Sequence, residues 1–149
     1  GWNGHSVKKC SCRIDQIERY QGRLSGPLLD RIDLSIRIAE SDRNWLNLPA
    51  GETSEIVRNR VVQARQIQMH RQNCPNGQLP AGQIEKVCQM DAQAATLLSK
   101  VVNRERLSAR SIQKVRRVSR TCADLAGEKT ILGEHIAEAF QYRLRMNGA

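Results

Sequence analysis

The chain has 149 residues, a net charge of +9 and five cysteines. Its length suits one ordinary domain, or a small domain with an arm. No stretch approaches the roughly 20 consecutive apolar residues that a membrane span needs. An odd number of cysteines without an N-terminal signal peptide is typical of a reducing cytoplasm rather than of a disulfide scaffold. The sequence therefore predicts a soluble, cytoplasmic protein with no membrane partner.

The positive charge is concentrated in the second part of the chain. Residues 1–53 carry 8 basic and 7 acidic side chains, whereas residues 54–149 carry 16 basic and 8 acidic ones. Such asymmetry is expected for a polyanionic partner, either nucleic acid or nucleotide phosphates, although a basic surface also serves solubility. Aromatic residues make up only 3% of the chain, so the core must be aliphatic, which favours helical packing.

The first segment, residues 1–13, has no hydrophobic periodicity and is predicted to be a loop or an arm. Cys10 and Cys12, with His5 nearby, raise the question of a zinc site, because thiolates and imidazoles are the ligands that zinc prefers. Two or three ligands do not complete such a site, so we predict no metal site in this chain.

Residues 14–38 combine a short helix with a strand. Ile14–Gln21 is expected to be helical, Gly26 and Pro27 supply a turn, and residues 34–38 alternate with the period of a half-buried strand. Asp30 and Arg31 would be displayed where the strand begins. One strand alone does not make a stable sheet, so residues 1–40 are interpreted as the edge of an α/β core.

Residues 41–53 are rich in turn formers and are predicted to be a linker. Residues 54–149 then form a mainly helical domain, in which Thr53 or Ser54, Asp91 and Ser108 supply N-caps and Gly127 a helix end. The fold class is therefore mainly α, a helical bundle preceded by the last helix and strand of an α/β core. The expected helices span residues 54–72, a short turn within 83–90, 91–106, 109–126 and 133–145.

Two helices have faces that can be assigned from the 3.6-residue period. In the first, residues 54–72, the apolar side chains share one face. That face contains Ile56, Val57, Val61, Ala64 and Ile67. The second, residues 109–126, places basic side chains opposite its apolar face. These are Arg110, Lys114 and Arg117, with Arg116 and Arg120 flanking them.

No complete catalytic constellation or phosphate-binding glycine loop is present. His70 and His135 are interpreted as surface or packed imidazoles. Arg31, on a turn, and Arg110, in the first turn of a helix, remain as candidates, because guanidinium groups bridge phosphate oxygens and neutralise the charge that develops in phosphoryl transfer. From the residues alone, a solvated surface charge is the preferred interpretation of each.

Several motifs resemble one family. SGPLLDRIDL at residues 25–34, LSAR at 107–110, VRRVSRTCADLAG at 115–127 and HIAEAFQYR at 135–143 are similar to segments of magnesium-chelatase-like AAA+ ATPases of the ComM/YifB group. The resemblance covers roughly residues 10–38 and 91–145. Family members carry a further C-P-C-G and both Walker motifs ahead of the position matching residue 1, so we expect this chain to be the C-terminal part of a longer protein.

The resemblance implies roles for single residues. Arg31 would be the arginine finger, offered to the nucleotide of a neighbouring subunit, and Arg110 would be the sensor-2 arginine of a helical lid. ATP and Mg²⁺ would be bound mostly by upstream residues, so the chain alone should be inactive. The family also implies a homo-oligomeric ring, a hexamer, acting on DNA as a helicase or branch-migration motor in natural transformation.

Two other interpretations remain open. The helices at 91–103 and 109–126 could form a helix-turn-helix in a stand-alone DNA-binding module. Lys114 and Arg117 are then the candidate DNA contacts, although such charges position a protein on DNA rather than specify a sequence. A small zinc module would rest on Cys10 and Cys12 alone.

Overall fold

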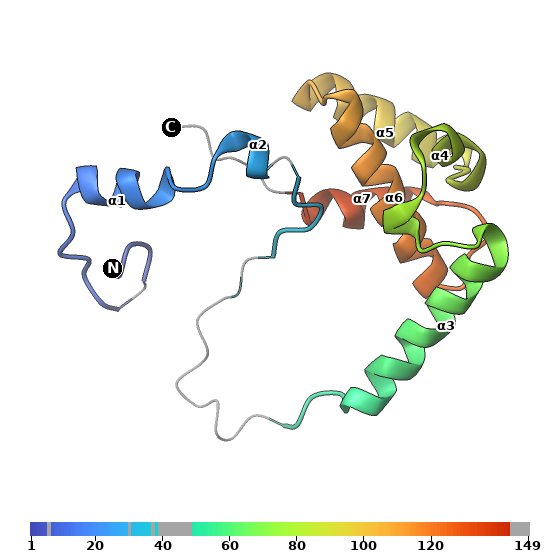
Figure 1. The fold of residues 1–149 in the computed structure, drawn as a ribbon, viewed down its shortest axis with the longest axis horizontal. Coiled ribbons are helices and arrows are strands. Elements are labelled where there is room, and N and C mark those ends of the chain that lie inside the picture. The colour runs from blue at the N-terminus through green and yellow to red at the C-terminus, as the bar shows by residue number, and fades with distance from the viewer. Residues whose placement is uncertain (6, 30, 37, 39–48, 144–149) are drawn as a thin grey trace. The chain divides into compact units, whose positions relative to one another are not determined.

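The computed structural model describes residues 1–5, 7–29, 31–36, 38 and 49–143, and these form two units, Gly1–Pro49 and Ala50–Ala149. The first contains the helices α1, Ile14–Gln21, and α2, Gly26–Leu29. In its described residues, the second contains one 3-10 turn and five α-helices (Figure 1). They are α3 (Ser54–Gln72), η2 (Asn76–Gln78), α4 (Ala81–Val87), α5 (Ala92–Glu105), α6 (Ala109–Leu125) and α7 (Gly133–Gln141).

The mainly helical fold confirms the predicted fold class, but the predicted strand is not formed. The described residues of 31–38 have no strand assignment, and Ile38 is 91% exposed. A strand needs a neighbour to satisfy its backbone groups, and the described chain provides none. Pro27, expected to make a turn, instead lies in the first turn of α2, where proline's fixed φ suits a helix.

Local signals predict the starts of α3, α5 and α6 and the ends of α3 and α6, whereas α4 begins at Ala81, ahead of the expected turn within residues 83–90. The side chains of Thr53, Asp91 and Ser108 accept hydrogen bonds from the backbone N–H three residues later, at 3.4, 2.6 and 3.2 Å. Asn73 ends α3 in the left-handed conformation, and Gly127 follows α6 with φ of 76°. These caps satisfy backbone groups that have no partner within the helix.

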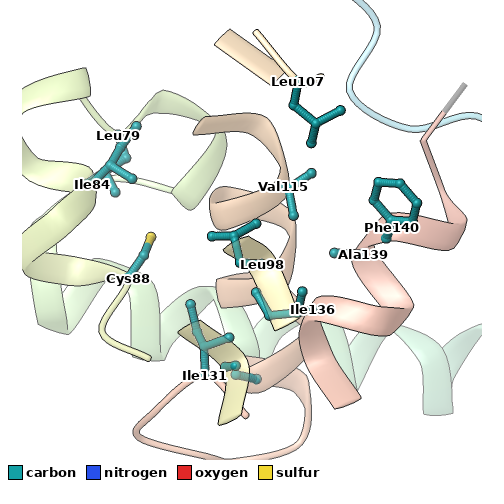
Figure 2. Close-up of a cluster of buried hydrophobic side chains, with 12 residues drawn as sticks. Leu79, Ile84, Cys88, Leu98, Leu107, Val115, Ile131, Ile136, Ala139 and Phe140 are labelled. Carbon is teal, nitrogen blue, oxygen red and sulfur yellow. The ribbon is translucent and has the colours of Figure 1, made fainter. Parts of the chain in front are cut away.

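One aliphatic core joins α4, α5, α6 and α7. Leu98 of α5, Val115 of α6 and Ile136 of α7 meet in it, with Leu79 and Ile84 at the side of α4 (Figure 2). Ile131 lies in the same core and forms a parallel bridge with Met90. The Ile131 N–H donates to the Gln89 carbonyl at 2.9 Å, which fixes the loop before α7 against the loop before α5.

The predicted apolar face of α3 is only partly buried. Ala64 is 5% exposed, but Ile56 and Val61 are each 52% exposed. The helix packs against α6 through its second half, while its Ser54 end extends away from the other helices of the unit (Figure 1). The apolar face of α3 is therefore buried at Ala64 and largely exposed elsewhere.

Candidate functional site

Arg31 lies in the first unit, directly after α2, and is exposed. Its Nη1 donates to the Pro27 carbonyl at 3.0 Å, and its backbone N–H donates to the Leu28 carbonyl at 2.9 Å. The side chain is thus folded back over the helical turn that precedes it. Asp30, the other charged residue of this motif, lies outside the described residues.

Arg110 and Lys114 follow each other on α6 at a spacing of four residues, and therefore on one side of the helix. Arg110 is exposed at the second residue of the helix, and Lys114 is half-buried. Ser108 caps this end of α6 through its hydroxyl. A helix N-terminus carries partial positive charge, so its first turn and an exposed guanidinium together suit a phosphate group.

Arg117 lies half-buried on α6. Its Nη2 donates to the Leu79 carbonyl at 2.8 Å, which holds the loop before α4. Arg116 Nη1 lies 3.7 Å from a carboxylate oxygen of Glu85 on α4. Both guanidinium groups therefore serve packing between α6 and the α4 region.

Arg120 does not flank a solvated basic face as predicted, because it is fully buried with 0% exposure. Its Nε donates to an Asp124 oxygen at 3.1 Å. Its Nη1 donates to the Lys129 carbonyl at 2.7 Å and its Nη2 to the Glu128 carbonyl. Burial lowers the pKa of this guanidinium, and the Asp124 carboxylate opposes that shift. The Arg120 guanidinium thus holds the loop after α6 in place through hydrogen bonds to two of its carbonyls.

Asp124 is the centre of a polar cluster that joins α3, η2 and α6. Arg71 donates to its two oxygens at 2.6 and 2.9 Å, and the Asn76 amide donates to it at 2.9 Å. The Asn76 side chain also donates to Thr121, and its backbone N–H donates to Gln68. The periodicity did not reveal this cluster. The available signal was that Asp124 is the single acid between residues 106 and 127 and follows Arg120 by four residues.

Neither histidine nor cysteine forms a metal site in the described part of the chain, where no group of three or more His, Cys, Asp or Glu side chains could hold an ion. His5 Nδ1 accepts the backbone N–H groups of Val7 and Lys8 at 3.1 and 3.2 Å. His135 is buried, and its Nδ1 accepts the Leu132 N–H at 3.0 Å. Both imidazoles have structural partners.

Among the described helices, none combines the length and apolar character needed to cross a membrane.

Comparison with known proteins identifies relatives over nearly the whole chain. The chain is 44% identical over 130 residues to competence protein ComM of Haemophilus influenzae, which is 86% of this chain and 26% of that protein. It is 37% identical over 134 residues to the uncharacterised protein YifB of Escherichia coli, which is 89% of this chain and 26% of that protein. An uncharacterised protein of Mycobacterium tuberculosis is 30% identical over 138 residues, 90% of this chain and 27% of that protein. The chain thus spans about a quarter of the length of these relatives.

Two family models match successive parts of the chain. The model for magnesium chelatase, subunit ChlI, matches residues 1–46 and so includes Arg31. The model for magnesium chelatase, subunit ChlI C-terminal, matches residues 51–143, which include all five α-helices of the second unit and Arg110. The chain belongs to the magnesium chelatase ChlI C-terminal family, and it is similar to the ComM and YifB proteins.

Proposed function

We propose that this chain is the C-terminal part of a ComM-like AAA+ ATPase that remodels DNA in natural transformation, as a helicase or branch-migration motor. The observation that carries the proposal is the succession of the two family matches, with Arg31 in the first and Arg110 in the second. The name of the Haemophilus relative, competence protein ComM, supports a link to competence.

In this proposal Arg31 acts on the ATP of a neighbouring subunit in a homo-oligomeric ring, a hexamer. Its bond to the Pro27 carbonyl is exposed, so the guanidinium can exchange that carbonyl for a phosphate at little cost. In the ring, the Arg31 guanidinium placed at the γ-phosphate of the neighbouring subunit would stabilise the negative charge of the transition state.

Arg110 senses the nucleotide of its own subunit from the first turn of α6. An exposed guanidinium at a capped helix N-terminus fits ATP phosphates. The described residues contain no acidic cluster suited to Mg²⁺, so the longer protein would hold Mg²⁺ and most of the ATP through other residues. Lys114 and Arg117 would contribute DNA contacts, Arg117 with the part of its guanidinium not bonded to Leu79.

A cytoplasmic location follows from the same proposal. All five cysteines are free thiols, and thiols persist in a reducing compartment.

The test uses the complete protein with its upstream nucleotide-binding core. Arg31→Ala should lower ATP hydrolysis by about 10³-fold or more, because arginine fingers contribute on this scale. Arg19→Ala, which removes another exposed arginine of the same unit, is the matched control and should leave hydrolysis unchanged. Mixing Arg31→Ala subunits with subunits that have a defective Walker motif should restore activity, because some interfaces then combine an intact nucleotide site with an intact finger.

Hydrolysis at the wild-type rate in Arg31→Ala rings would refute the role of Arg31. DNA binding by the chain without any effect of Arg31→Ala or Arg110→Ala on hydrolysis would instead favour the stand-alone DNA-binding module.

A further inference from the structure

Three basic side chains surround the corner where α5 ends and α6 begins, and none of them has a place in the ATPase chemistry. Lys100 and Arg104 lie one turn apart on α5, and Arg106 follows the last residue of that helix. All three are exposed. We call Lys100, Arg104 and Arg106 the basic corner.

Arg106 has a backbone conformation that an arginine rarely adopts. Its φ is 47° and its ψ is 52°, which is the left-handed region. Glycine is the usual residue at this position of a helix end, and asparagine the next, as at Asn73 at the end of α3. A strained backbone at an exposed charged residue is the kind of outlier from which function can be inferred. A glycine here would relieve the strain but would remove the charge.

The sequence around this corner is rich in basic residues. Residues 100–117 contain seven basic side chains and a single acid, Glu105. Arg104 donates to Glu105 at 2.9 and 3.0 Å while its own side chain stays 72% exposed. The corner therefore offers positive charge that nearby acids only partly balance, unlike Arg71 and Arg120, which are committed to Asp124.

The spacing and the neighbouring surface suit a phosphodiester backbone. Lys100 and Arg104 are separated by about 6 Å along the axis of α5, which is close to the ~7 Å that two phosphate steps of one strand cover along a duplex. Lys100 also borders an open hollow of about 350 Å³ that Gln93 helps to line. Neutral amides such as that of Gln93 commonly contact phosphate and sugar, whereas the Thr96 hydroxyl donates to the Ala92 carbonyl at 2.8 Å.

We propose that the basic corner binds the phosphate backbone of DNA, as a surface separate from the ATP-facing residues Arg31 and Arg110. The choice of DNA as the polyanion rests on the proposed function. The contact is independent of sequence, because lysine and arginine at phosphates set position and affinity rather than base preference. Nucleotide hydrolysis is not required for it.

The test measures binding of the 149-residue chain to a short fluorescent DNA duplex by anisotropy, without ATP, between about 50 and 200 mM salt. The corner variant is Lys100→Gln with Arg106→Gly. The matched control is Arg58→Gln with Arg65→Gln, which removes the same charge from exposed positions on α3. Each lost phosphate contact lowers the slope of log K against log salt by about 0.9. The corner variant should therefore lose about 1.8 from the slope and on the order of 50-fold in affinity near 0.1 M salt, with the control close to wild type.

Arg106→Gly alone separates binding from folding. Glycine adopts a φ of 47° without strain, so the Arg106→Gly variant should melt at the wild-type temperature or above it. Its affinity for DNA should fall. A lower melting temperature with unchanged DNA binding would mean that Arg106 is structural and would overturn the proposal.

The proposal is also overturned if the wild-type chain does not bind the duplex, or if the corner and control variants weaken binding equally, which would show a net-charge effect. None of these outcomes bears on ATP hydrolysis by Arg31→Ala rings. A result that overturns DNA binding by the basic corner can therefore be distinguished from one that overturns the proposed ATPase role.

Discussion

Replacing Asp124 by alanine should remove a large share of the stability of the second unit. The Asp124 side chain is fully buried and accepts bonds from Arg71, Arg120 and Asn76. Without it, the buried Arg120 charge has no counter-ion, and two further donors lose their acceptor. Removing one partner of a buried ion pair costs about 3 to 5 kcal/mol, a substantial part of the roughly 5 to 15 kcal/mol that stabilises an ordinary domain.

Urea unfolding of the 149-residue chain, followed by circular dichroism of the helices, measures this loss. With a slope of about 1.5 to 2 kcal/mol per M for a unit of this size, the midpoint should fall by about 2 M. Asp124→Asn keeps the shape and one acceptor oxygen but loses the charge, so it should lie between alanine and wild type. A double-mutant cycle with Arg71→Gln then gives the coupling across α3 and α6.

Glu52→Ala is a matched control, because Glu52 also accepts two hydrogen bonds from one arginine. Arg60 donates to its oxygens at 3.0 and 2.9 Å, and these hydrogen bonds lower the pKa of the Glu52 carboxyl. Both side chains are about half exposed, and exposed pairs add little to stability. The midpoint of Glu52→Ala should not change measurably. If Asp124→Ala were equally silent, burial would not be what gives the Asp124 cluster its energy.

Two further outcomes are expected. Burial raises the pKa of the Cys122 thiol to about 11, so the folded state keeps a proton that the unfolded state releases above about pH 9. The contribution of the Cys122 thiol to the free energy of unfolding should be constant below pH 9. It should fall by up to about 3 kcal/mol between pH 9 and 11. Cys122→Ala should reduce the fall seen in denaturant titrations. Asp91→Ala removes the N-cap of α5, whose carboxylate accepts the Ala94 N–H at 2.6 Å, and should cost about 1 kcal/mol. Asp91→Ser should recover most of that stability, and an unchanged midpoint in Asp91→Ala would refute the role of the cap.

The sequence predicted those features that depend on neighbouring residues. The N-caps at Thr53, Asp91 and Ser108 mark helix starts because the bond spans only three residues. The candidate residues Arg31 and Arg110 came from motifs, and their proposed roles remain predictions.

Features that depend on distant partners could not be predicted in this way. Arg120 was placed by its angle on the helix, which does not reveal that Asp124 and two loop carbonyls surround it. The Arg71–Asp124 pair joins residues 53 positions apart. The prediction of a strand at residues 34–38 was wrong for a related reason. An alternating apolar pattern shows which side chains could be buried but not whether a neighbouring strand exists.

Some basic side chains of α6 bond within the fold and others are exposed at the surface. This difference decides where a polyanion can bind. Arg120 is buried against Asp124, and Arg116 and Arg117 reach Glu85 and the Leu79 carbonyl. The N–H groups that make these contacts are not available to phosphates. The net charge of residues 54–149 therefore overstates the capacity of the unit for phosphate. Exposed basic side chains lie at the first turn of α6 and at the end of α5, where the proposed ATP-facing Arg110 follows the proposed DNA-facing Arg106 by four residues.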